Sequence, residues 1–298
     1  MKQIHKLSKG TCAALALALP LGAGLPLVAA PSVRPATQVV QNAVLVSDAR
    51  MINPTTAELI LADGKIVTLD FYGENIFRLF RDDAGGILRD PKATPPAQIL
   101  TGGARRATGG VRLTKSAGEV VIATPRISVS VDRKTGLMNV RDLATGKVVV
   151  EETAPAALEK GKTTLTFKAG ADEYFFGGGV QNGRFSHKGK AIAIENTNNW
   201  VDGGVASPTP FYWSTKGYGL LWHTFKPGRY DFGATDKGQV LLSHNEDYLD
   251  VFLMVNDGAV PLLNDFYQLT GNPVLLPKFG FYEGHLNAYN RDYWTEDK

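Results

Sequence analysis

Amide, carboxylate and indole side chains gather between residues 196 and 202, where the sequence reads NTNNWVD. Proteins bind sugars through planar amides and carboxylates that hydrogen-bond to hydroxyls, and through aromatic rings that stack on the C–H face of the sugar. Asn198, Asn199, Trp200 and Asp202 supply both kinds of group, so we predict that they contact a sugar. Asn and Asp are also common in turns, so an ordinary polar loop is the alternative interpretation.

A second group of polar and aromatic residues lies near the C-terminus, in the sequence FYEGHLNAYNR at 281–291. It follows an apolar run typical of a buried strand. In barrels of parallel β-strands, the active sites lie at the carboxyl ends of the strands. We predict His285, Asn287 and Tyr289 as further sugar-binding residues. A lone histidine is more often structural than catalytic, so His285 is expected to hydrogen-bond a hydroxyl.

The third unusual segment is the glycine-rich stretch YFFGGGVQNGRFSHKGK at 174–190. A phosphate-binding loop is excluded because no Lys-Ser/Thr pair opens a helix and no dinucleotide fingerprint is present. Two interpretations of Gly177–Gly179 stay open: a backbone that passes close to another surface, or a tight turn between strands. The aromatic run Phe211–Trp213 is likewise open between a sugar-binding surface and a core strand.

Several other kinds of function are excluded by the composition. The five histidines show no paired spacing for a metal, and no Gly-x-Ser-x-Gly elbow is present, so we expect no metal and no serine hydrolase. We expect no cofactor. A net charge of +3 over 298 residues gives no reason to expect nucleic acid as a partner.

The first residues have the composition of an export signal. Lysines at the start precede an apolar run at Cys12–Leu19, and Val28–Ala30 offers small residues for cleavage. We therefore predict a signal peptide at 1–30, a disordered lead-in at 31–40, and a secreted or periplasmic protein. The apolar run is too short and too broken to span a membrane. Cys12 is the only cysteine, so the mature protein would have no disulfide.

From residue 41 to 270 the sequence predicts one antiparallel β-sandwich, in which apolar and polar residues alternate and turn dipeptides recur. Turns are predicted at Asp63-Gly64, Tyr72-Gly73, Thr135-Gly136 and Thr145-Gly146, and a loop at 81–110. The strands expected between them are Leu59–Leu61, Lys65–Phe71, Asn75–Phe80, Glu119–Ala123, Arg126–Val131, Leu137–Val140 and Lys147–Val150.

The end of the chain has a different pattern. Apolar residues at helical spacing predict a short helix over Val260–Leu269, which Gly271 and Pro273 would end. Pro277–Tyr282 then predicts a buried strand. We expect residues 271–298 to be the start of a second domain that is cut short.

These segments together resemble glycoside hydrolase family 31. The resemblance rests on EYFFGGG at 173–179, Asn196–Asn198, Pro210–Tyr212, Gly217–Leu221 and Pro277–Phe281, and it runs from about residue 40 to the end. Family members open with a galactose-mutarotase-like β-sandwich followed by a (β/α)8 barrel. The stretches GGGVQNG and FYEGHLNAYNRD are more similar to the bacterial dextranase and α-glucosyltransferase branch than to the digestive maltases.

The resemblance implies a retaining enzyme that hydrolyses or transfers α-linked glucosides, with an α-linked oligo- or polysaccharide as its partner. Its two catalytic aspartates would lie on later barrel strands, beyond Lys298, so the fragment alone is expected to be inactive. The family's sandwich sends a loop over the barrel mouth to the sugar, and the matching stretch here is Asn196–Asp202. Many members have the sequence NTD where this chain has Asn196–Asn198, and Asp202 is expected to take the place of that carboxylate.

Two other functions fit the same residues. One is a secreted sugar-binding sandwich without catalysis. The other is an aldose epimerase, which needs a histidine acid facing a glutamate base. His187, His223 or His244 could pair with Glu195 or Glu246 in such an enzyme.

Overall fold

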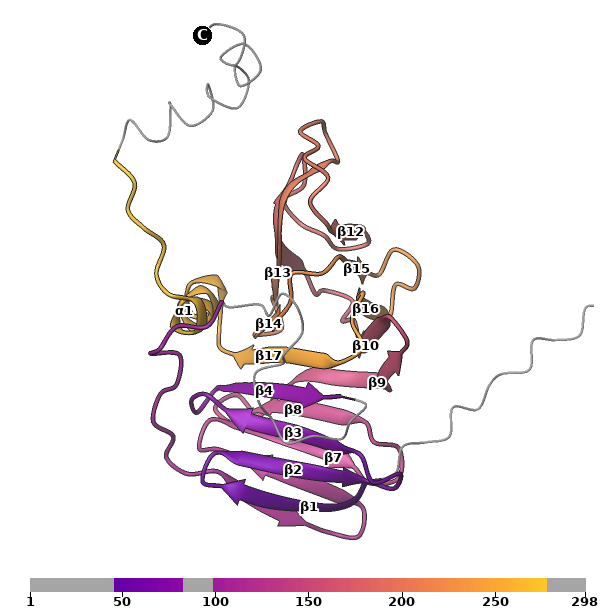
Figure 1. Ribbon diagram of the computed structural model, residues 1–298, viewed down its shortest axis with the longest axis vertical. Coiled ribbons are helices and arrows are strands. Elements are labelled where there is room, and N and C mark those ends of the chain that lie inside the picture. The colour runs from indigo at the N-terminus through magenta and orange to yellow at the C-terminus, as the bar shows by residue number, and fades with distance from the viewer. Residues whose placement is uncertain (1–45, 83–98, 278–298) are drawn as a thin grey trace, which may run out of the picture. The chain divides into compact units, whose positions relative to one another are not determined.

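The computed structural model describes residues 46–82 and 99–277, which belong to one compact unit of the chain. These residues form seventeen strands and one helix (Figure 1). The strands form two sheets in which every pairing is antiparallel. The one described helix is too short to cross a membrane.

The first sheet has eight strands and joins the beginning of the described chain to its end. Strands β1 to β4 follow one another, and β4 then pairs with β17, next to β14, β13 and β11. In spatial order the strands are β1 (Val46–Asn53), β2 (Thr56–Leu61), β3 (Ile66–Phe71), β4 (Ile76–Arg81), β17 (Leu249–Val255), β14 (Tyr218–Trp222), β13 (Val205–Ser214) and β11 (Phe175–Gln181).

The second sheet has nine strands, six of which, β5 to β10, form a meander of consecutive hairpins. Beyond this meander lie β16, β15 and β12. In spatial order the strands are β12 (Ala191–Ile194), β15 (Gly228–Phe232), β16 (Gln239–His244), β10 (Lys162–Lys168), β9 (Val148–Glu159), β8 (Met138–Asp142), β7 (Ile127–Asp132), β6 (Glu119–Ala123) and β5 (Arg112–Lys115).

The main apolar core consists of side chains from both sheets. Strand β7 shows the rule: Ile127, Val129 and Val131 are buried, while the serines between them are half-buried. Burying one such side chain contributes about 1.5–3 kcal/mol. The largest fully buried side chains include Trp222, Tyr212, Tyr218, Tyr230, Phe71, Phe77, Phe167, Phe175 and Phe232.

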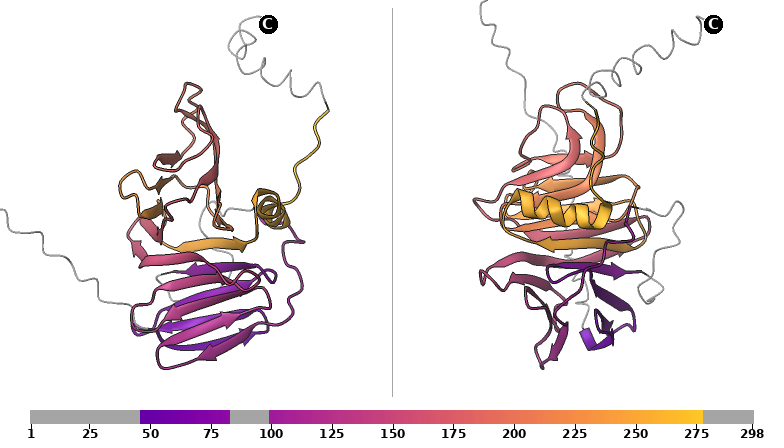
Figure 2. Two further views of the ribbon diagram at one scale, coloured as in Figure 1. Left: turned by 180° about the vertical axis from the view of Figure 1, so that it is seen from behind. Right: turned by 90° about the vertical axis from the view of Figure 1, so that its left-hand side faces the viewer.

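A smaller core lies on the other face of the first sheet, under the helix α1 (Ala259–Thr270). Figure 2 shows the helix lying across this sheet. Leu262 and Leu269 are fully buried, and the ring of Phe266 stacks on Phe211 with 4.4 Å between ring centroids. The helix therefore covers the face of β14 and β17 that the sandwich core leaves open.

A buried charge cluster joins β4, β17 and the residue that follows β14. Arg78 donates two hydrogen bonds of 2.6 Å to the carboxylate of Asp250, and Nδ1 of His223 lies 2.8 Å from the same carboxylate. All three side chains are at most 3% exposed. Burial alone would raise the pKa of Asp250, but the hydrogen bonds from Arg78 and His223 hold it below its ordinary value.

Most of the local predictions that fall on described residues are confirmed. The predicted strands fall within β2, β3, β4, β6, β7, β8 and β9 to within one or two residues, except that β9 continues to Glu159. The predicted helix is α1, and Gly271 follows it with a positive φ of 89°. Residues 99–110 of the predicted loop contain no strand, and its residues 83–98 lie outside the described part.

A single carboxyl group, that of Glu152, lines a small apolar cavity in the sandwich. The cavity has a volume of about 50 Å³, and its other lining residues include Leu69, Val131, Met138 and Leu249. Glu152 is only 6% exposed and accepts one hydrogen bond, from the backbone N–H of Met138 at 2.8 Å. Burial raises the pKa of Glu152 to about 8, and the Met138 N–H opposes this only in part.

This carboxyl group should make the fold less stable as the pH rises. The ordinary pKa of the side chain is 4.5, so between that value and about 8 the unfolded chain releases a proton that the folded protein keeps. The free energy of unfolding should fall across this window, with a slope approaching ~1.4 kcal/mol per pH unit. Urea denaturation from pH 5 to 9 should show the slope in the wild type and its loss in Glu152→Gln.

The matched control is Glu119→Gln, which changes an exposed glutamate on β6 and should keep the wild-type pH dependence. If the free energy of unfolding changed with pH in the same way in the wild type and in Glu152→Gln, the assignment of a neutral Glu152 would be contradicted.

Candidate functional site

The predicted sugar loop, Asn196–Asp202, lies within the connection between β12 and β13, which is tied to the end of β11 by backbone and amide hydrogen bonds. The Asn182 N–H donates to the Gly204 carbonyl (3.0 Å), and the Gly203 N–H donates to the Asn182 carbonyl (2.9 Å). The Asn182 side-chain amide donates to the Asn199 carbonyl (2.8 Å). Two of the three segments singled out in the sequence therefore meet in one structure, at the end of the arm formed by β11 and β13 at the top of Figure 1.

Inside the loop, side chains hold the backbone in a fixed turn. Oδ1 of Asn196 accepts the Asn198 N–H (3.0 Å), and Oδ1 of Asn198 accepts the Trp200 indole N–H (3.0 Å). Asn198 has a φ of 49°, a left-handed conformation that asparagine tolerates better than most residues. The Trp200 ring is 58% exposed. The turn thus orients an indole toward solvent with its N–H already satisfied.

Asp202 lies next to Gly183, on the β11 side of the loop. A side chain at Gly183 would overlap Oδ1 of Asp202, and Gly183 has a φ of 68°. Asp202 is exposed, and no hydrogen bond or ion pair joins its carboxylate to any residue that the structure describes. No local pattern in the sequence predicts this fit, since Gly183 and Asp202 meet only because β11 and β13 pair.

The glycine triplet has a structural role. Gly177, Gly178 and Gly179 all have positive φ, and the pairing of β11 with β13 shifts register between Gly177 and Gly179. A Cβ on Gly177 would lie 2.7 Å from the Phe211 carbonyl oxygen, and one on Gly179 would overlap the Ser207 carbonyl oxygen. Of the two interpretations left open by the sequence, a backbone that passes close to another surface is confirmed: that surface is β13, and the glycines lie within β11 and not in a turn.

The aromatic run at 211–213 belongs to a core strand. Tyr212 is fully buried and Phe211 is 5% exposed, while the half-buried Trp213 stacks on Phe176 with 4.5 Å between centroids. The core-strand interpretation of this run is therefore confirmed.

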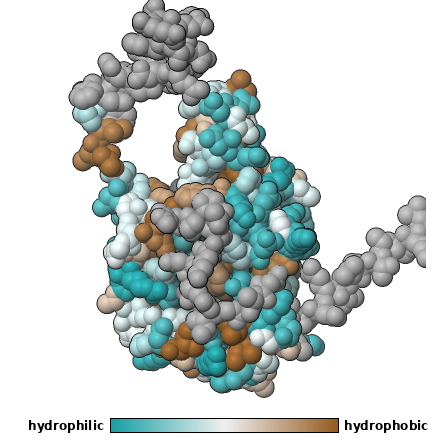
Figure 3. Space-filling model, in the orientation of Figure 1, coloured by the Kyte–Doolittle hydropathy of each residue, from teal (hydrophilic) through white to brown (hydrophobic). Residues whose placement is uncertain are grey.

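The remaining predicted site residues, His285, Asn287 and Tyr289, lie outside the described residues, as does most of the predicted strand Pro277–Tyr282. The described chain ends just before them in an exposed apolar run, visible in brown in Figure 3 after α1. Its residues are Val274, Leu275 and Leu276, which are 84%, 97% and 53% exposed.

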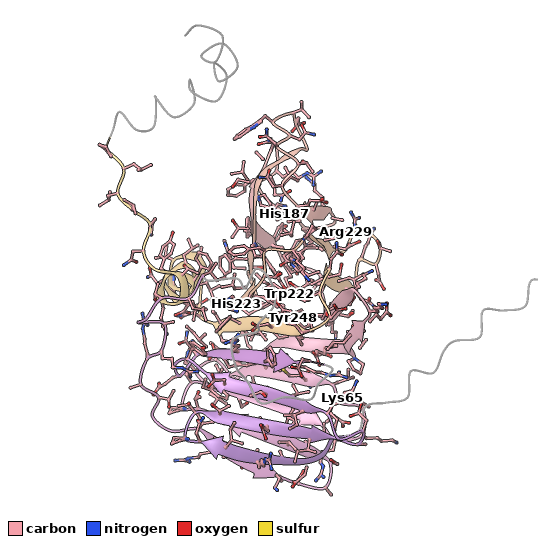
Figure 4. The ribbon with its side chains drawn as sticks, viewed as in Figure 1. Lys65, His187, Trp222, His223, Arg229 and Tyr248 are labelled. Carbon is pink, nitrogen blue, oxygen red and sulfur yellow. The ribbon has the colours of Figure 1, made fainter. Side chains whose placement is uncertain are left out.

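The three described histidines are buried among structural partners. Nε2 of His187 lies 2.8 Å from the Gly177 carbonyl, and burial lowers the pKa of His187. His244 lies 3.0 Å from the Tyr230 hydroxyl, and burial lowers its pKa to about 4. His187 and His223 lie apart in Figure 4.

Within residues 46–82 and 99–277, no hydrogen bond or ion pair joins the ring of any of these histidines to the carboxylate of Glu195 or Glu246, and the one hydrogen bond between them runs from the Glu246 N–H to the His244 carbonyl. The acid–base pair that an aldose epimerase needs is therefore not assembled among these residues.

The close passage of the glycines can be tested by comparing two substitutions with the same backbone strain. Gly179 (φ 77°) and Gly189 (φ 71°) are both left-handed, but nothing lies within 4 Å of a Cβ at Gly189. Gly189→Ala should lower the free energy of unfolding by about 1–2 kcal/mol. Gly179→Ala should lower it further, because β13 blocks the added methyl group. Equal losses by urea denaturation would contradict the close passage.

Comparison with known proteins identifies the family to which this fold belongs. A family model described as the glycosyl hydrolase 31 N-terminal galactose mutarotase-like domain matches residues 66–231, more than half of the chain. In sequence, a stretch of 71 residues, 24% of this chain and 9% of the relative, is 35% identical to alpha-xylosidase A of Aspergillus niger.

Solved structures show the same fold at low identity. A dextranase of Flavobacterium johnsoniae in complex with isomaltotriose superimposes with a TM-score of 0.71 and 15% identity, over 85% of this chain and 33% of that one. An α-xylosidase from a soil metagenome in complex with xylose gives a TM-score of 0.63 and 19% identity, over 78% and 36%.

The chain thus spans about a third of the length of these structures. The predicted fold class, an antiparallel galactose-mutarotase-like β-sandwich, is confirmed for the described residues. The chain belongs to glycosyl hydrolase family 31, of which it contains the N-terminal galactose mutarotase-like domain.

Proposed function

We propose that this chain provides the sugar-facing loop of a retaining α-glycosidase whose two catalytic aspartates lie outside it. The observation that carries the proposal is the loop Asn196–Asp202, which is fixed by its own side chains and by β11 while its indole and its carboxylate face solvent. The substrate would be an α-linked oligosaccharide, in keeping with the isomaltotriose and xylose bound by the dextranase and the α-xylosidase of similar fold.

The loop suits binding because its shape is set before the sugar arrives. A loop that is already ordered loses little conformational entropy on binding, so more of the contact energy appears as affinity. The carboxylate of Asp202 can accept hydrogen bonds from two sugar hydroxyls, and charge-assisted hydrogen bonds of this kind are stronger than neutral ones. The ring of Trp200, which is 58% exposed, can contribute to stacking on the C–H face of the same sugar unit.

The chemistry itself would come from a pair of carboxylates about 5–5.5 Å apart, one attacking the anomeric carbon and one protonating the leaving oxygen. The loop would stabilise the transition state by hydrogen-bonding to the hydroxyl groups of the sugar, and it would take no part in proton transfer. His285, Asn287 and Tyr289 would meet the same sugar unit from the segment after the sandwich. Whether water or a second sugar accepts the glycosyl group would depend on residues beyond this chain.

The role of the loop can be tested in a polypeptide that carries this chain together with the proposed catalytic barrel. Asp202→Ala and His285→Ala should each lower kcat/KM for an α-linked glucoside by roughly ten- to a hundred-fold, since a hydrogen bond to a charged group contributes about 1.5–3 kcal/mol. Trp200→Ala should mainly raise KM if the ring stacks equally on ground and transition states. The 298-residue chain alone should give no turnover.

The matched control is Asp172→Ala, which removes another exposed aspartate, one that precedes β11. It should leave the kinetics unchanged. Wild-type kinetics for Asp202→Ala and His285→Ala combined, in a folded protein, would place the sugar elsewhere.

We also propose that the protein is exported, on the basis of the basic start and the apolar run before Ala30. Expressed in a Gram-negative host, the chain should leave the cytoplasm and lose its first ~30 residues. Mass spectrometry of the periplasmic fraction measures the new N-terminus. Periplasmic protein that still carries Met1–Ala30 would contradict the signal peptide.

A further inference from the structure

A groove of about 310 Å³ lies beside the sugar loop, where the two sheets meet. Ile194, the last residue of β12, pairs with Gly228, the first residue of β15, so Glu195 and Pro227 continue side by side beyond the strand ends. Pro208 and Pro210 of β13 form the opposite wall. The volume is at the lower end of the range for small-molecule sites, about 300–1,000 Å³.

The groove carries an exposed aromatic ring, that of Phe225, which is 62% exposed. Single apolar side chains are common on protein surfaces, so the exposure alone does not indicate a site. The significance of Phe225 depends on the backbone that presents it and on the polar groups around it.

The turn that carries Phe225 is anchored on both sides of the ring. The Thr224 hydroxyl donates to the buried carboxylate of Glu246 and accepts the Lys226 N–H (3.0 Å). The Lys226 carbonyl lies 3.0 Å from Nδ1 of His244, and its ammonium group lies 3.3 Å from Glu246. The Phe225 ring is therefore held out by a fixed frame, and its exposure is not the result of a loose loop.

Two polar groups with unused hydrogen-bonding capacity line the same groove. Glu195 is exposed, and within the described residues its carboxylate has no hydrogen bond or ion pair. Asn196 uses its Oδ1 to accept the Asn198 N–H, which leaves its two amide hydrogens free to donate. A carboxylate, an amide and an aromatic ring are the combination that recognises the hydroxyls and the C–H face of a pyranose.

We propose that this groove is a second sugar-binding site of the sandwich, which takes a sugar unit of an α-linked oligosaccharide against Phe225, Glu195 and Asn196. The class of ligand rests on the proposed function, but the site itself is made entirely of described residues. Asn196 belongs to the groove and also fixes the turn that presents Trp200. The two sites therefore adjoin, and a longer oligosaccharide has a contact surface beyond the loop.

The experiment is a titration of the 298-residue chain with isomaltotriose, followed by NMR chemical-shift changes. The wild type should bind with saturable shifts, and Phe225→Ala should bind roughly tenfold more weakly through the loss of stacking. Glu195→Gln should weaken binding by a smaller factor, because the amide still hydrogen-bonds but without a charge. Phe185→Ala, which removes a ring that is 87% exposed elsewhere, is the matched control and should bind as the wild type does.

The outcomes separate this inference from the proposed function. Wild-type affinity in Phe225→Ala, with its backbone signals unchanged, overturns the groove, as does a wild-type chain that isomaltotriose does not shift. Weaker binding in Trp200→Ala but not in Phe225→Ala assigns the sugar to the loop alone. That result overturns the groove and leaves the proposed function intact, since the latter is measured by kinetics in the longer polypeptide.

Discussion

The ion pair between Arg78 and Asp250 is the interaction on which the first sheet most depends. Both groups are buried, and removing one partner of such a pair typically costs about 3–5 kcal/mol, because the other charge is left without compensation. The pair lies on β4 and β17, which form the seam between the N-terminal strands β1 to β4 and the strands that lead to the sugar loop. His223 extends the cluster to the end of β14. A shift in the register of β4 against β17 would separate the charges of Arg78 and Asp250, and neither could then be solvated by water.

The sugar loop and the groove are both connected to the seam between β4 and β17 through the neighbouring strands β14 and β13. Close passage of Gly177 and Gly179 against β13 brings the end of β11 next to the loop, where Asn182 can hold it. The groove in turn needs β13 beside the ends of β12 and β15. Strand pairing therefore determines where the two candidate sites lie, and the loops at the strand ends then supply their polar side chains. This arrangement is the usual division between a rigid scaffold and functional loops.

The parts of this fold that could be predicted from sequence are those that depend on neighbouring residues. Alternation at 127–131, turn dipeptides such as Asp63-Gly64, and the helical spacing of Leu262 and Leu269 each record a local backbone geometry. The sequence predicts that this strand ends at Val150. In the structure β9 continues past Pro155, and the irregular pairing with β10 at this point accommodates the proline.

Long-range relations could not be predicted, because no local pattern records them. The sequence indicated the chemistry of Asn198, Trp200 and Asp202, but not the amide of Asn182 that fixes their loop. It offered two roles for the glycine triplet, and only the pairing with β13 decides between them. The exposed ring of Phe225 was not singled out, since its turn is held by Glu246 and His244, some twenty residues further along the chain.

The seam between β4 and β17 also determines when the protein can finish folding. Arg78 and Asp250 are 172 residues apart, and contacts of such long sequence separation form late because the loop between them must first be closed. The hairpins of β5 to β9 need only their neighbours and can form as they are synthesised. Until residue 255 has been made, β4 has an unpaired edge that another chain can extend. A break in translation before this point leaves a half-sheet prone to aggregation, with an open side in what becomes the middle of the molecule.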